Sequence, residues 1–193
     1  MRTRRQDGFS LLEVTVVAAV GMIITATALP NVVNGMAILR LRANITSLSG
    51  VIQNCRMLAM KQNQTMSTHY APTSTGVVAY VKAANDHAAY TCQNSQVELE
   101  APVVQTTSPA GPGAPPALDS TTLGFTPQTG DPSFTVTGLP CAYSSGTCAN
   151  HGFIYYFHDL RPRGQQGWGA LSISPAGRLK NGTGAAPTGF PDR

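Results

Sequence analysis

The residues best suited to acid–base or metal chemistry stand around one aromatic-rich segment. His151, His158 and Asp159 flank the run Gly152–Phe157. A histidine beside a carboxylate can act as a base or a ligand, but here no nucleophile and no metal-ligand spacing accompany it. The chain also has no G-x-S-x-G, no P-loop and no paired carboxylates in a recognisable setting. We therefore expect strand-end histidines, with no catalytic residue, no metal and no cofactor, in a protein that is not an enzyme.

Two basic side chains follow a predicted tight turn in Gly177-Arg178-Leu179-Lys180. Side chains placed this way project together and can bridge phosphates, and Arg161 and Arg163 would extend the patch. The charge distribution fits this view, because residues 83–160 hold six acids and no Lys or Arg, whereas residues 161–193 hold five bases and one acid. The alternative is a hairpin turn that carries two solvated bases.

Four cysteines allow three disulfide pairings, and none of them forms a C-x-x-C motif. Cys141 and Cys148 are separated by six residues that include Ser-Ser-Gly-Thr, which favours a local bridge across a loop. That pairing would leave Cys55 to bond Cys92. Disulfides persist only in an oxidising compartment, so both bridges require export.

One ionisable side chain, Glu13, interrupts an otherwise apolar run over residues 9–29. Such a run can span a bilayer as a helix, because about 20 residues at a rise of 1.5 Å cover the hydrocarbon core. Three arginines before it (Arg2, Arg4 and Arg5) would hold the N-terminal side in the cytoplasm. A carboxylate at this depth costs roughly 2.5–3.5 kcal/mol and needs a functional reason.

Two simpler interpretations of this segment are a secretory signal peptide and a plain membrane tether. Ala26-Thr27-Ala28 offers an A-x-A site for signal cleavage, which would leave a mature chain that begins near Leu29. Glu13 argues against both interpretations, because neither of them has a use for a carboxylate inside the apolar helix.

The run Gly8-Phe9-Ser10-Leu11-Leu12-Glu13 resembles the class III signal of type IV prepilins and type II secretion pseudopilins. The resemblance implies that a prepilin peptidase cuts between Gly8 and Phe9 and methylates the new N-terminus. Glu13 would then be the fifth mature residue, where the family keeps a glutamate that can neutralise the N-terminal amine of an adjacent subunit. Pro30 falls where pilins commonly carry a proline, so we expect the helix to break there.

Apolar periodicity predicts that the helix resumes after Pro30 as an amphipathic segment. Its buried stripe follows steps of four and three residues: Leu41, Ile45, Leu48, Ile52, Cys55 and Ala59. We expect a leader peptide over residues 1–8, a transmembrane and filament-core helix over 9–30, the amphipathic half of the helix over 31–66, and a β-rich head over 67–193. Cys55 lies on the predicted buried face, within reach of a strand.

From about residue 67 the pattern has the period of two that is typical of strands. We expect strands near residues 76–81, 89–92, 96–99, 123–125, 134–136, 152–157 and 169–174, a Pro-rich loop near 102–116, and a frayed C-terminal stretch over 178–193. A charged fraction of only 11% with plentiful Gly and Pro suits an exported, loop-rich head. The predicted fold class is α+β, with one long helix packed on an antiparallel sheet.

The segment Trp168–Lys180 is similar to the closing strands of GspH/FimT-type minor pilins and pseudopilins. The resemblances together imply a minor type IV pilin or a type II secretion pseudopilin, held in the bacterial inner membrane with its head outside. Its implied partners are prepilin peptidase, the inner membrane and other pilins or pseudopilins in a filament. The residues do not decide between the pilus and the secretion system, nor between a major and a minor subunit.

The alternative function is a FimT-like minor pilin that binds DNA for natural transformation. It would use a G-R-x-R motif for which Gly177-Arg178-Leu179-Lys180 is the counterpart here, with Arg161 and Arg163 nearby. Lys180 departs from that motif, because a lysine lacks the bidentate fork of an arginine.

Overall fold

The computed structural model describes residues 10–72, 76–86, 96–100, 103–106, 117–118, 120–128, 130–159 and 167–184. The chain divides into two compact units, Met1–Met36 and Ala37–Arg193, which we describe separately. Helix α1 (Leu11–Gln62) contributes residues to both. It continues through Pro30, so the break predicted there is wrong. A proline removes only one backbone donor, and α1 stays helical on both sides of it.

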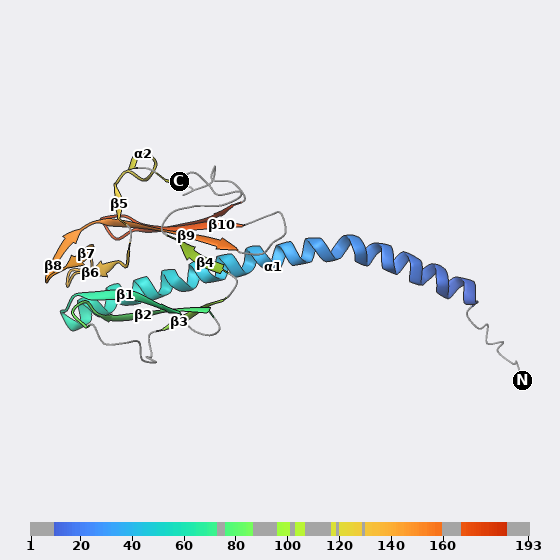
Figure 1. Cartoon of the computed structure of the whole chain (residues 1–193), viewed down its shortest axis with the longest axis horizontal. Coiled ribbons are helices and arrows are strands. Elements are labelled where there is room, and N and C mark those ends of the chain that lie inside the picture. The colour runs from blue at the N-terminus through green and yellow to red at the C-terminus, as the bar shows by residue number, and fades with distance from the viewer. Residues whose placement is uncertain are drawn as a thin grey trace, which may run out of the picture. The chain divides into compact units, whose positions relative to one another are not determined.

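The second unit, which we call the head, is built around the C-terminal part of α1. All six residues of the predicted apolar stripe are at most 1% exposed, from Leu41 to Ala59. They share one hydrophobic core with residues from two sheets, and this part of the helix lies between strands of the two (Figure 1). The stripe was predictable because apolar residues spaced three and four apart fall on one face of a helix.

Helix α1 ends four residues before the predicted boundary, at Gln62. Asn63 adopts a positive φ of 50°, and the N–H of Gln64 donates to the carbonyl of Ala59 at 3.2 Å. A residue in the left-handed region with this bond is a Schellman cap, and asparagine is one of the few non-glycine residues that tolerates it. The cap frees the chain to enter the first strand at Met66.

Sheet A is antiparallel throughout. Its strands lie in the order β3 (Val97–Glu100), β2 (Gly76–Ala83), β1 (Met66–Pro72), β6 (Ser133–Phe134), β7 (Pro140–Ser144) and β8 (Thr147–Asn150). The longest pairing joins β1 and β2, with Met66 opposite Ala83 and Pro72 opposite Val77.

Sheet B contains the aromatic strand. Its order is β11 (Leu179–Gly184), β10 (Trp168–Ile173), β9 (Gly152–Asp159) and β4 (Val103–Thr106), all antiparallel, and the short β5 (Pro127–Gln128) pairs with β9 in parallel. The predicted α+β class is confirmed, although the head has two sheets and one parallel pair.

The two faces of sheet B are both covered. Phe153, Tyr155 and Phe157 of β9 point into the core around α1. The residues between and beside them form a second cluster on the opposite face, made of Ile154, Tyr156, Trp168 and Ala170 with Leu118 and Leu123 against it. This second cluster explains why β9 is buried at nearly every position although strand residues alternate between faces.

Two of the strand predictions need correction. Residues 123–125 are not a strand, because Leu123 ends the short helix α2 (Ser120–Leu123) and packs on the second cluster. Strand β6 stops at Phe134, since residues 135–139 form a turn. The expected strand at 89–92 lies outside the described residues.

Two segments predicted as loop or frayed chain are strands instead. Residues 103–106 of the Pro-rich stretch form β4 on β9, and residues 179–184 form β11, paired with β10 along its length. Ladder hydrogen bonds in a sheet outweigh the weak strand preference of glycine-rich sequence. The rest of the Pro-rich stretch, residues 107–116, and residues 185–193 lie outside the described residues.

The cysteines agree with one of the two expected bridges. Cys141 and Cys148 form a disulfide that links β7 to β8. Cys55 is a free thiol with no exposed surface, so the expected Cys55–Cys92 bridge is not formed, and Cys92 itself lies outside the described residues. Cys55 packs in the core as a small apolar side chain, and burial raises its pKa to about 12.

Candidate functional site

The N-terminal unit places Glu13 in the first turn of α1, with its side chain exposed. The carbonyl of Ser10 accepts the N–H groups of Glu13 at 3.0 Å and of Val14 at 3.2 Å, so the helix starts at this point. A carboxylate in a first turn is favoured by the helix dipole. Gly8 and Phe9 lie outside the described residues.

Residues Leu11–Ala28 of α1 form a helical stretch that is long and apolar enough to cross a membrane, judged by length and composition alone. None of this segment is buried within the protein. Large apolar side chains such as Leu11 and Met22 are more than 70% exposed. Exposure of this much apolar surface to water is unfavourable, and it is typical of segments that contact lipid or other chains.

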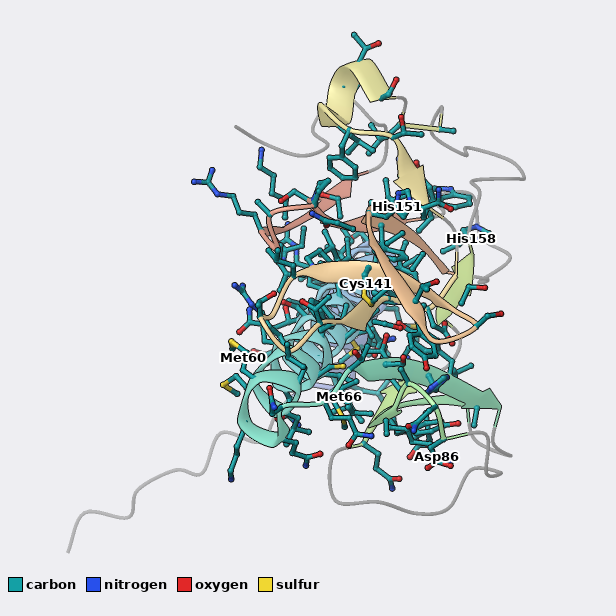
Figure 2. The ribbon with its side chains drawn as sticks, turned by 90° about the vertical axis from the view of Figure 1, so that its left-hand side faces the viewer. Met60, Met66, Asp86, Cys141, His151 and His158 are labelled. Atoms are coloured by element: carbon teal, nitrogen blue, oxygen red, sulfur yellow. A yellow bond between two sulfur atoms is a disulfide. The ribbon has the colours of Figure 1, made fainter. Side chains whose placement is uncertain are left out.

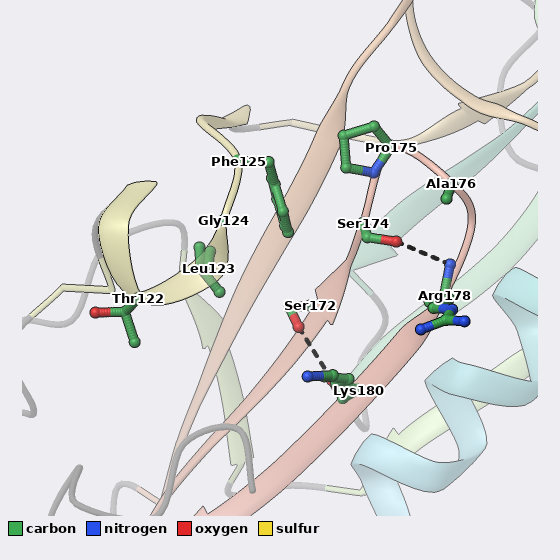
Figure 3. A pocket seen from close by; sticks show the side chains of 10 residues that line it. All are labelled: Thr122, Leu123, Gly124, Phe125, Ser172, Ser174, Pro175, Ala176, Arg178 and Lys180. Carbon is green, nitrogen blue, oxygen red and sulfur yellow. Dashed lines mark hydrogen bonds between the residues drawn. The ribbon is translucent and has the colours of Figure 1, made fainter. Parts of the chain in front are cut away.

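The head carries a hollow of about 530 Å³ beside the hairpin of β10 and β11. It contains both basic residues of the predicted motif, Arg178 and Lys180 (Figure 3). The remaining lining comes from the segment after α2, from β10 and from the hairpin turn: Thr122, Leu123, Gly124, Phe125, Ser172, Ser174, Pro175 and Ala176.

The turn that presents Arg178 follows from its sequence. Gly177 donates its N–H to the carbonyl of Ser174 at 2.8 Å, and Pro175 supplies the fixed φ that suits the first central position of such a turn. Gly177 has a φ of 78°, which glycine adopts without strain. The N–H of Arg178 then donates to Ser174 Oγ at 3.1 Å and closes the hairpin.

Strand alternation sets the direction of the two bases. Arg178 and Lys180 are exposed, whereas Leu179 between them packs on the core around α1. Neither basic side chain forms an ion pair with a residue that the structure describes, where the two ion pairs found are His69–Asp131 and Lys82–Asp86. The hollow is therefore a positively charged, partly apolar site. Arg161 and Arg163 lie outside the described residues, so their part in the patch stays a prediction.

Arg56 of α1 supports this turn, and sequence reasoning missed it. Its Nη1 donates to the carbonyl of Gly177 at 3.4 Å. A Cβ added at Gly138 would lie 3.0 Å from Arg56 Nε, and one added at Gly177 would lie 3.3 Å from its Nη1. Arg56 therefore packs close to two glycine turns and donates a hydrogen bond to one of them. No local pattern in the sequence marks this residue, because its partners are far away along the chain.

Two of the histidines singled out by the sequence are placed apart by the structure. His151 and His158 lie near opposite ends of β9 (Figure 2), and His158 stacks on the Trp168 ring at a centroid distance of 4.3 Å. The side chain of Asp159 is outside what the structure describes. Among the described residues, no group of three or more His, Cys, Asp or Glu side chains is placed to hold a metal ion.

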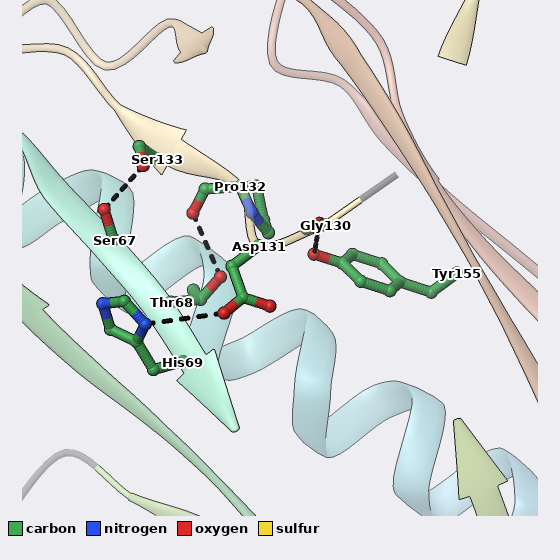
Figure 4. Close-up of polar contacts among 8 residues, drawn as sticks. All are labelled: Ser67, Thr68, His69, Gly130, Asp131, Pro132, Ser133 and Tyr155. Carbon is green, nitrogen blue, oxygen red and sulfur yellow. Dashed lines mark hydrogen bonds and ion pairs between the residues drawn. The ribbon is translucent and has the colours of Figure 1, made fainter. Parts of the chain in front are cut away.

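A cluster of polar side chains joins β1 to residues 130–133 and has a structural role. Ser67 Oγ of β1 lies 2.6 Å from Ser133 Oγ, and Thr68 Oγ1 donates to the Pro132 carbonyl at 3.1 Å (Figure 4). Beside them His69 Nδ1 lies 3.4 Å from Asp131, and Tyr155 donates to the Gly130 carbonyl at 2.9 Å. The cluster therefore fastens residues 130–133 to β1 and to β9. Burial raises the pKa of Tyr155 well above its ordinary value, so its hydroxyl remains a donor.

Comparison with known proteins bears on the N-terminal segment. Residues 3–29 match the family model of the prokaryotic N-terminal methylation motif. The match covers the N-terminal segment alone: the chain joins this prepilin-type methylation motif and an apolar helix to an α+β head that carries a disulfide.

The search of curated proteins gave no match. Among solved structures, the crystal structure of the type IV minor pilin FimU from Pseudomonas aeruginosa (strain PAO1) is 19% identical and covers 72% of this chain and 86% of its own, with a TM-score of 0.39. That likeness is too slight to support a conclusion about this chain.

Proposed function

We propose that this protein is a filament subunit, processed by prepilin peptidase between Gly8 and Phe9 and assembled through its apolar helix. The observation that carries the proposal is the methylation motif over residues 3–29, which includes an apolar helical segment whose side chains are not buried by the rest of the protein. Packing of such helices against one another would bury the surface that the isolated chain exposes. The protein would act as a structural subunit and not as an enzyme.

Glu13 is the residue we expect to direct assembly. Insertion of its carboxylate into a bilayer is unfavourable by roughly 2.5–3.5 kcal/mol. A pairing of this carboxylate with a cation would therefore lower the free energy of the inserted subunit. After cleavage the amine of Phe9 would be a free cation at the start of the helix, four residues from Glu13. A staggered neighbour would bring its own amine to this carboxylate, and the pair would remove two poorly solvated charges at once.

The test replaces Glu13 with glutamine, which keeps the shape of the side chain and removes its charge. We expect Glu13→Gln to be processed and held in the membrane but to be lost from sheared filaments. The matched control is Glu98→Gln, which neutralises an exposed carboxylate on β3 of the head. Recovery of Glu13→Gln in filaments at the level of the control would contradict the proposed role.

We place the subunit in the bacterial inner membrane before assembly, with the N-terminus in the cytoplasm and the head outside. The three arginines of the leader support this orientation, and the disulfide of the head fits an oxidising compartment. Its partners would be prepilin peptidase and other pilins or pseudopilins. We propose a minor type IV pilin or a type II secretion pseudopilin.

The hollow at the β10–β11 hairpin favours DNA binding as a second candidate function. Arg178 and Lys180 face the same side and make no ion pair with a described residue, so both can neutralise phosphates. We expect Arg178→Ala/Lys180→Ala to weaken DNA retention by the full-length protein. Arg42→Ala/Lys61→Ala, which removes the same charge from exposed positions on α1, is the matched control. Equal retention by both double variants would remove this candidate.

A further inference from the structure

The hollow combines two chemistries on opposite sides. Arg178 and Lys180 provide two cations on the side of the hairpin, while Phe125 and Leu123 provide an aromatic ring and an aliphatic side chain on the other (Figure 3). A volume of about 530 Å³ is within the range of sites that hold small organic molecules. A bare anion would use only the cationic side, so the lining fits a ligand with both a charged and a planar apolar part.

The ring of Phe125 is held in place by its contact with β9. A Cβ at Gly152 would overlap two atoms of this ring and would lie 2.8 Å from the Ile173 carbonyl, so the ring packs directly on the glycine backbone. Phe125 is nevertheless only half-buried, because its remaining surface faces the hollow. Leu123 beside it is anchored on the second cluster of sheet B. The aromatic side of the hollow is therefore a preformed platform.

The charged side is equally well positioned. Ser174 Oγ accepts the N–H of Arg178, and its own hydroxyl hydrogen remains available to a ligand. Arg56 supports the same turn from the helix through the Gly177 carbonyl. Hydroxyl and guanidinium donors around one opening are the usual partners of phosphate oxygens.

We propose that this hollow binds single-stranded nucleic acid by stacking one unpaired base on Phe125 while the adjacent phosphates lie on Arg178 and Lys180. The inference rests on the second candidate function, DNA binding, and specifies that the bound strand is unpaired. Bases within a duplex are already stacked and cannot reach a ring inside a hollow, whereas every unpaired base has a free π-face. Duplex DNA would meet only the two cations.

The experiment uses the full-length protein in detergent micelles and two probes of matched length, a labelled oligo(dT) and a fully paired, blunt-ended duplex. We expect Phe125→Leu to weaken oligo(dT) binding roughly 5- to 150-fold and to leave duplex binding unchanged. Phe125→Tyr keeps the ring and should bind oligo(dT) like the unmodified protein. Fluorescence of Trp168, the single tryptophan, checks that each variant is folded.

The basic pair is tested in parallel. Arg178→Ala/Lys180→Ala should weaken both probes and flatten the dependence of log K on log salt by about 1.4 for oligo(dT), at about 0.7 per lost phosphate contact. If Phe125→Leu binds oligo(dT) normally while the basic variant does not, stacking is wrong and nucleic-acid binding stands. If the unmodified protein binds neither probe, nucleic-acid binding falls and the stacking inference falls with it.

Discussion

Replacement of Gly169 with alanine should destabilise the head, because this glycine lets α1 approach sheet B. An added Cβ would overlap Ile45 Cδ1 and would lie 3.4 Å from the Gly182 carbonyl and 3.5 Å from Leu41 Cγ. Gly169 does not have a positive φ, so the backbone itself accepts alanine. The overlap in a packed core should therefore set the effect, which we expect to be about 1–3 kcal/mol.

The clash can be removed by a second substitution. Ile45→Val deletes Cδ1, the atom that the new Cβ would overlap, and alone it should cost about 0.5–1.5 kcal/mol. The double variant Gly169→Ala/Ile45→Val should therefore be more stable than the sum of the single changes, by a coupling of roughly 0.5–2 kcal/mol. Each kcal/mol corresponds to a shift of about 2–4 °C in the melting temperature of a head of this size.

Thermal unfolding of the full-length protein in detergent, followed by the fluorescence of Trp168, measures all three variants. This tryptophan is 1% exposed and adjacent to Gly169. The control is Gly50→Ala in α1, where an added Cβ meets nothing within 4 Å and alanine should stabilise the helix by about 1 kcal/mol. Strictly additive single effects, or a neutral Gly169→Ala, would refute the packing that we describe between α1 and β10.

Three further predictions concern the cysteines and Arg56. Cys141→Ala/Cys148→Ala should lower the stability of the head by about 2 kcal/mol, the value expected for a short closed loop, and a melting temperature unaffected by dithiothreitol would contradict this. Because Cys55 keeps its proton in the folded state to about pH 12 while the unfolded thiol releases it near 8.5, stability should fall by about 1.4 kcal/mol per pH unit between these values. Urea titrations at pH 8 to 11 should show this slope, and Cys55→Ala should reduce it. Arg56→Met should speed amide exchange at the Ser174–Arg178 turn by roughly 2- to 10-fold relative to Arg42→Met, as measured by mass spectrometry, since one supporting hydrogen bond is lost.

The helix was the most predictable element of the head. The stripe from Leu41 to Ala59 follows from the 3.6-residue period, and each of its six side chains is buried. Its end was not predicted, because the cap depends on Asn63 in a left-handed conformation that the sequence does not reveal. The strand predicted over 152–157 was found from its aromatic residues and lies within β9, but the division into two sheets depends on long-range pairing that no local pattern records.

The glycine-rich C-terminal strand was the main error in the head. Residues 179–184 have weak strand preference, yet β10 offers them a complete ladder, and this places Lys180 beside Arg178 on one face. The sequence therefore predicted the two bases but not the surface around them. Phe125 and Arg56 join the hollow and its turn through tertiary contacts with residues far away in the sequence, and single-chain periodicity holds no signal for such contacts.

The most direct test of the filament-subunit account is the N-terminal sequence and mass of the mature protein, purified from membranes of a bacterial host that has its prepilin peptidase. The account predicts a chain that begins at N-methylated Phe9 and lacks residues 1–8. A chain that begins near Leu29 would indicate a cleaved secretory signal, and an intact Met1 would indicate a plain membrane anchor. Either of these results would contradict assembly through Glu13 and the apolar helix.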